Sequence, residues 1–111
     1  MRQFAIRRAR SRRWFEMRER VLDGRNWNTS DDVYDSFFKA VRAPEWHGRN
    51  FNALIDSIET GSINEIGVPY RLIITHNGTV GEGARKMVSD FVDLIHEMKA
   101  RGCPVDIAIQ E

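Results

Sequence analysis

The chain has 111 residues, the size of one ordinary domain, with 41% hydrophobic and 30% charged residues, a balance typical of globular rather than disordered or fibrous proteins. Its single cysteine, Cys103, cannot form an internal disulfide, which argues against a disulfide-stapled secreted module. No apolar run reaches the roughly 18–20 residues of a membrane-spanning helix. The first twenty residues are charged throughout and lack the apolar stretch of a signal peptide. We therefore expect a cytoplasmic, single-domain protein.

The net charge of +1 conceals two regions of opposite sign. Residues 1–20 contain eight arginines and two glutamates, a net charge of +6, whereas nine basic and fourteen acidic side chains leave residues 21–111 at −5. We expect residues 1–17 to form an arginine-rich extension and residues 18–111 to form the domain. An acidic domain disfavours nucleic acid as its own ligand, because phosphate binding needs clustered lysine and arginine. A basic protein partner fits its charge better.

The arginine-rich segment leaves alternatives open. Its apolar residues keep no sustained period, so it is either a solvated leader or an added edge element that packs Trp14 on the domain. Arginine runs with aromatic residues are also typical of nucleic-acid-binding arms. A mitochondrial presequence fits less well, because residues 1–20 contain two glutamates and a single serine.

The first half of the domain predicts one strand and two helices. A short strand over residues 18–22 ends at Asp23-Gly24, a dipeptide that favours a tight turn, and Trp27 folds back onto the core. Hydroxyl and acidic side chains at residues 29–32 mark a helix start, and that helix ends before Pro44. A second helix spans about residues 49–59 and ends at Gly61.

The second half predicts a strand, a helix and a strand. The strand at residues 70–75 is nearly continuously apolar, which suits an interior position. A glycine-containing loop over residues 76–83 leads into a long helix at about residues 84–101, and the last strand covers residues 105–109. Such a unit is parallel with a right-handed crossover. Together with the first strand and helix, it predicts a small α/β domain of three layers.

Most motifs that could carry chemistry fail in detail. The loop from Gly78 to Gly83 follows a strand and opens a helix, but it lacks the lysine and hydroxyl residue of a phosphate-binding loop and the spacing of a dinucleotide fingerprint. The three histidines have no partner at metal-ligand spacing, and no neighbour of Cys103 suggests a catalytic role. We therefore expect no enzymatic activity, no cofactor and no metal.

Residues 44–56 are the most informative segment. Two aromatic rings precede Gly48, and a helix then begins that exposes amides and the carboxylate of Asp56. Exposed aromatics beside a fixed carboxylate are typical of protein interfaces. In the alternative interpretation, Trp46 packs on the core and Asn50 only caps the helix.

A family resemblance rests on this segment. Gly48-x-Asn50-x-Asn52-Ala53-Leu54-x-Asp56 resembles the signature of the barstar family of ribonuclease inhibitors. Further similar segments follow in the same order as in the family, and the resemblance covers about residues 19–111. These segments are Val21-Leu22-Asp23-Gly24, Val68-Pro69-Tyr70-Arg71-Leu72-Ile73-Ile74, and Glu97-x-x-x-x-Gly102-Cys103 with the strand Val105–Ile109.

The resemblance implies a fold and a function. The fold is a small three-stranded parallel sheet packed with three to four helices. The function is that of an antitoxin or immunity protein, a monomer that covers the active site of a basic ribonuclease 1:1. Asp56 would enter the phosphate subsite in place of RNA, and Trp46 would stack over the catalytic histidine. The other residues implied for the partner-binding surface are His47, Gly48, Asn50, Asn52, Ile55 and Glu97.

The sequence also departs from the family pattern. Asn52 stands where an aspartate is common, Ile55 stands where a larger aromatic residue occurs, and Arg49 adds positive charge beside them. The loop at residues 76–83 is short, so that a small additional helix is missing there. The alternative function is nucleic-acid binding through the N-terminal arginines. Removal of residues 1–16 separates the two hypotheses, because it abolishes RNA binding in the second and spares nuclease inhibition in the first.

Overall fold

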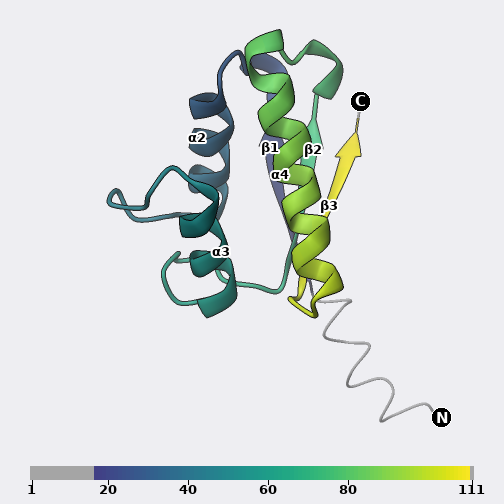
Figure 1. Ribbon diagram of the computed structural model, residues 1–111. Helices are drawn as coiled ribbons and strands as arrows, with labels where there is room; N and C mark the ends of the chain where they lie inside the picture. The colour runs from purple at the N-terminus through teal and green to yellow at the C-terminus, as the bar shows by residue number, and fades with distance from the viewer. Residues whose placement is uncertain (1–16, 111) are drawn as a thin grey trace, which may run out of the picture.

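The computed structural model describes residues 17–110 (Figure 1), so the expectations for the arginine-rich segment lie outside the described residues except at Met17. The described residues form three strands, three α-helices and two short 3-10 turns. Their order is β1 (Arg18–Asp23), the 3-10 turn η1 (Gly24–Asn26), α2 (Ser30–Val41), α3 (Phe51–Thr60), β2 (Tyr70–Thr75), the 3-10 turn η2 (Asn77–Thr79), α4 (Glu82–Ala100) and β3 (Val105–Gln110).

The sheet is parallel throughout. Its strands lie in the order β1-β2-β3, with Arg18 opposite Tyr70 and Tyr70 opposite Val105. The predicted parallel strand–helix–strand unit of the second half is therefore confirmed, and the fold is the expected α/β type with a three-stranded parallel sheet. Three α-helices accompany it within residues 17–110.

Within residues 17–110 the helices cover one face of the sheet, so the expected three layers are wrong for this part of the chain, which has two. Leu22, Leu72 and Ile107 point to the helical side and are buried, whereas Val21 and Ala108 on the opposite face are exposed. The strand order explains this arrangement. Both connections step in the same direction across the sheet, and crossovers of one hand then place every helix on the same side. Figure 1 shows the helices gathered in front of and beside the sheet.

Helix α2 is capped at its start and packs against α4. The Thr29 side chain accepts a hydrogen bond from the Asp32 amide, and the Asp32 carboxylate accepts one from the Thr29 amide, which forms the reciprocal cap expected from residues 29–32. The ring of Phe37 packs edge-on against Phe91 of α4 with centroids 5.6 Å apart. Trp27 is buried as expected.

Helix α4 begins two residues earlier than the sequence predicts, with Gly81 as its N-terminal cap. Although α4 has 19 residues, no helix within residues 17–110 is both long and apolar enough to cross a lipid bilayer.

Candidate protein-binding site

The loop between α2 and α3 exposes a large aromatic side chain to solvent. Helix α2 ends at Val41, and its C-terminal cap Arg42, with a φ of 56°, reverses the chain. The Ala43 amide donates to the Phe38 carbonyl at 2.9 Å. The His47 amide then donates to the Pro44 carbonyl at 3.0 Å, which closes a turn. Trp46 lies in this turn and is 73% exposed. The interpretation that Trp46 packs on the core is therefore wrong.

His47 lies beneath the loop. It is buried, and its ring packs on Phe38 with centroids 4.5 Å apart. Its Nδ1 donates a hydrogen bond to the Gly48 carbonyl at 2.9 Å, since a carbonyl can only accept. His47 therefore anchors the loop from inside.

Helix α3 is fixed at its start by an amide side chain. The Asn50 Oδ1 atom accepts a hydrogen bond from the Ala53 amide at 2.8 Å, which is a typical N-terminal cap. Leu54 and Ile58 bury one face of the helix in the core. The opposite face is exposed at Asn52, Asp56 and Glu59, positions that are neighbours at helical spacing.

The carboxylate of Asp56 is therefore directed away from the core. Within residues 17–110, it takes part in no hydrogen bond or ion pair of its own. An exposed carboxylate that has no partner among these residues is available to a positively charged group of another molecule.

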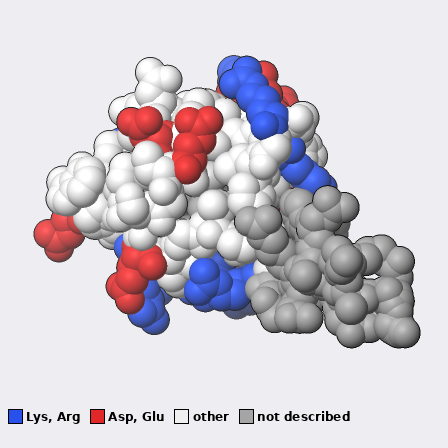
Figure 2. Space-filling model, turned by 90° about the horizontal axis from the view of Figure 1, so that it is seen from below, with Lys and Arg blue, Asp and Glu red and all other residues white. Residues whose placement is uncertain are grey.

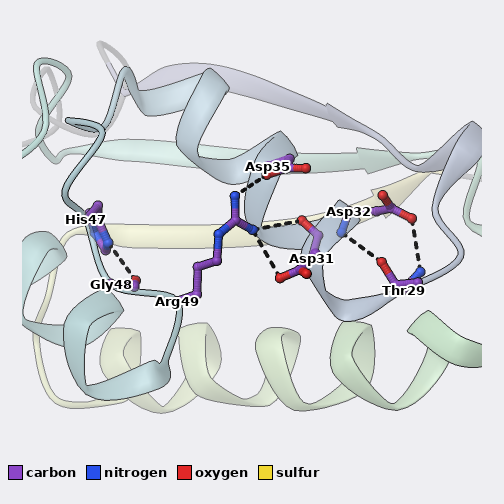
Figure 3. Close-up of polar contacts among 7 residues, drawn as sticks. All are labelled: Thr29, Asp31, Asp32, Asp35, His47, Gly48 and Arg49. Atoms are coloured by element: carbon purple, nitrogen blue, oxygen red, sulfur yellow. Dashed lines mark hydrogen bonds and ion pairs between the residues drawn. The ribbon is translucent and has the colours of Figure 1, made fainter.

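Arg49 does not add its charge to this face. Figure 3 shows its side chain directed to α2, where it pairs with Asp35 and, at 3.2 Å, with Asp31. The hydrogen bond that Arg49 donates to the Asp35 carboxylate raises the pKa of the Arg49 guanidinium further above its ordinary value. The expectation that Arg49 adds positive charge beside Asn52 and Ile55 is therefore wrong, because two carboxylates of α2 neutralise that charge.

The remaining candidates differ in exposure. Ile55 is half-buried against the core, whereas Glu97 is exposed on α4 and pairs with Arg101 at 3.6 Å. Helix α3 and the last turns of α4 lie at the same end of the molecule (Figure 1). Seen from that end, the described surface is mostly uncharged, with small groups of acidic and basic side chains that adjoin in places (Figure 2).

The glycine loop has a packing role. A Cβ atom at Gly81 would lie 2.6 Å from the Asn28 side-chain oxygen, and one at Gly83 would overlap the Asn28 carbonyl. These glycines allow the start of α4 to approach the backbone of Asn28 closely. Within the described part of the chain, no group of His, Cys, Asp and Glu is placed to hold a metal ion. Burial raises the pKa of the Cys103 thiol and so disfavours a reactive thiolate.

Sequence reasoning missed the partners of Arg49. Asp31 and Asp35 are four residues apart on α2 and therefore share one helix face, which is a detectable signal. The sequence contains many arginines, however, and nothing in its spacing indicates that Arg49 is the one that reaches them.

Comparison with known proteins identifies one family. The family model described as Barstar (barnase inhibitor) matches residues 17–110, which is nearly the whole chain. Comparison with curated proteins gave no match.

Proposed function

The chain belongs to the barstar family of ribonuclease inhibitors, and we propose that it binds a basic ribonuclease through residues 44–56 and covers the active site of that enzyme. The observation that carries the proposal is the exposed carboxylate of Asp56, which has no ion-pair partner within residues 17–110, on the same loop–helix unit as the exposed Trp46. The Asn50 cap joins the two parts of this unit. In this proposal the protein acts in the cell as an antitoxin or immunity protein and is itself no enzyme.

Asp56 takes the place of an RNA phosphate. A ribonuclease holds phosphate with arginine and lysine side chains, and a carboxylate among them accepts short, charge-assisted hydrogen bonds. Because residues 21–111 carry a net charge of −5, attraction to a basic enzyme also accelerates the encounter, by roughly 10–10³-fold for strongly complementary charges.

The neighbouring residues complete the contact surface. Trp46 supplies a large apolar area over the active site, which is typical of an interface anchor. Asn52 and Ile55 border Asp56 on α3, and Glu97 adds an acidic contact from α4. Gly48, Asn50 and the buried His47 hold the loop in position.

Substitution of Asp56 tests the proposal. Barnase, the enzyme in the family description, is the first probe, and a small basic nuclease, if one is encoded beside this gene, is the second. We expect the unmodified protein to inhibit RNA cleavage at stoichiometric amounts. Asp56→Ala should weaken binding by ~2–5 kcal/mol, as the loss of one partner of a buried charge pair does, a range that draws on the barnase–barstar pair itself. Asp56→Asn removes the charge but keeps the size of the side chain, so its comparison with Asp56→Ala distinguishes the contribution of the charge from that of the size.

The matched control is Asp93→Ala, which removes an exposed aspartate from α4 and should leave affinity unchanged. Thermal unfolding of each variant checks that the fold is intact. If neither nuclease is inhibited by the unmodified protein, the proposed function is wrong. If inhibition occurs but Asp56→Ala and Asp93→Ala bind equally well, only the role of Asp56 is wrong.

A further inference from the structure

The binding loop runs beside an open cleft. Part of residues 43–49 and the second half of α2 line this space of about 500 Å³, with Phe38, His47 and Arg49 among its walls. A loop next to open space lacks continuous packing beneath it. The contacts that reach across to α2 therefore determine where the loop lies.

Arg49 makes several of these contacts at once. One terminal nitrogen, Nη1, donates to the Asp31 carboxylate at 3.2 Å and to the Asp31 carbonyl at 3.3 Å, and the other, Nη2, pairs with Asp35 (Figure 3). The planar, forked guanidinium can reach two carboxylates in this way, and a lysine ammonium cannot match that geometry. An isolated exposed ion pair contributes little to stability. Here, however, several contacts hold the same guanidinium, and they fix its position together.

Arg49 is also linked to the rest of the loop through an aromatic ring. Its guanidinium carbon lies 5.4 Å from the centre of the Phe38 ring, within the range of a cation–π contact. The Phe38 ring also packs on His47, which holds the Gly48 carbonyl. His47 and Arg49, the two neighbours of Gly48 in the chain, therefore both contact the Phe38 ring.

We propose that Arg49 is a positioning residue, which latches residues 44–50 to α2 and keeps the loop ordered in the free protein. The latch consists of Arg49, Asp31, Asp35 and Phe38. A loop that is ordered before binding avoids the entropic cost of ordering it in the complex. The consequence for affinity rests on the proposed function, whereas the effect on the free loop does not.

Hydrogen exchange of the free, full-length protein tests the latch. The His47 amide, which donates to Pro44, reports opening of the turn. In Arg49→Gln we expect its exchange to accelerate roughly threefold to tenfold, as for the loss of a small local stabilisation. Amides inside β2, at the centre of the sheet, should keep their exchange rates. In Arg49→Lys, the exchange rate of the His47 amide should lie between the rates in the unmodified protein and in Arg49→Gln.

A double-mutant cycle tests whether Arg49 acts through α2. Asp35→Asn should accelerate exchange at His47, and adding Arg49→Gln to it should produce less than the product of the two single effects. The matched control is Arg25→Gln, which removes an exposed arginine that also pairs with an aspartate, Asp23, outside the loop. Arg25→Gln should leave the exchange rate of the His47 amide unchanged.

Each outcome decides the proposal. Faster exchange confined to the loop, with non-multiplicative effects of Arg49 and Asp35, supports the latch. Unchanged exchange at His47, equal acceleration at all amides, or fully multiplicative effects would overturn it. If Arg49→Gln does not fold, Arg49→Lys and Asp35→Asn give the same decision. Binding to barnase then tests the consequence, and because exchange needs no partner, failure of the latch is distinguishable from failure of the proposed function.

Discussion

Two helix starts in this domain are built in opposite ways. At the start of α3, the side chain of Asn50 caps the helix, and the preceding loop exposes Trp46. At the start of α4, Gly81 provides no side-chain cap, and the helix instead lies directly against the backbone of Asn28. The start of α3, which we call the exposed junction, is held by side chains and leaves Trp46 in solvent. The start of α4, which we call the packed junction, is held by close backbone contact. Substitutions at the packed junction should therefore affect stability, and substitutions at the exposed junction should affect binding more.

The largest expected effect on stability lies at the packed junction. In Gly83→Ala the new Cβ atom would overlap the Asn28 carbonyl, and a backbone atom cannot move aside as a flexible side chain does. We expect a loss of about 1–3 kcal/mol in the free energy of unfolding, typical of an overpacked site, even though alanine favours helix more than glycine does. Urea denaturation measures the loss, and affinity for the nuclease at temperatures where the variant is folded should not change.

The equivalent substitution at the exposed junction provides the control. A Cβ atom at Gly48 would lie 3.2 Å from side-chain atoms of Ala53 and Asn50, so a shift of a few tenths of an ångström accommodates it. Gly48→Ala should therefore cost less than about 1 kcal/mol. If it destabilises the protein as much as Gly83→Ala, the contrast between the two junctions is incorrect.

A smaller loss of stability is expected at the cap of α3. Asn50→Ala removes the acceptor of the Ala53 amide and should lower the free energy of unfolding by about 1 kcal/mol. Affinity should fall as well, because the cap joins the loop to the helix that carries Asp56. Asn50→Asp retains an acceptor and should restore most of the stability. An equal loss in both variants would mean that the hydrogen bond is not the cause.

Much of the fold could be predicted from the sequence because its signals are local. The capping residues 29–32, the apolar strand over residues 70–75 and the parallel strand–helix–strand unit are confirmed. The number of layers could not be predicted from single elements. It depends on the order of the strands, and strand order is set by packing between distant segments rather than by periodicity.

The candidate site was only partly predictable for a similar reason. Helical spacing places Asp56 opposite the buried Leu54 and Ile58, and its exposure follows from that pattern. The exposure of Trp46, the burial of His47 and the pairing of Arg49 with α2 depend on the path of a loop. No periodic signal specifies that path, and composition alone favours neither a buried nor an exposed Trp46.

The smallest expected effect, a dependence on pH, also separates the two junctions. The amides of Asn28 and Thr29 donate to the Asp32 carboxylate at 2.7 and 3.0 Å, and these bonds hold the pKa of Asp32 below its ordinary value of 3.8. Because the folded pKa is the lower one, the contribution to stability is complete above the ordinary value and is lost as the pH falls through the folded value. Asn28 is the residue that packs on Gly83, so acid should loosen the packed junction. The cap of α3 is a neutral amide without a proton to gain in this range.

Comparison with Asp32→Asn isolates this contribution. Urea denaturation between pH 6 and about pH 2.5 should show the unmodified protein as the more stable of the two above about pH 4, with a difference that shrinks as Asp32 is protonated. Hydrogen exchange at low pH should show weaker protection of the Asn28 and Thr29 amides, while the Ala53 amide stays protected by Asn50. A stability difference that is constant across this range would mean that the side chain acts by its shape rather than by its charge. In that case both junctions would respond to acid alike, and the contrast between them would reduce to packing alone.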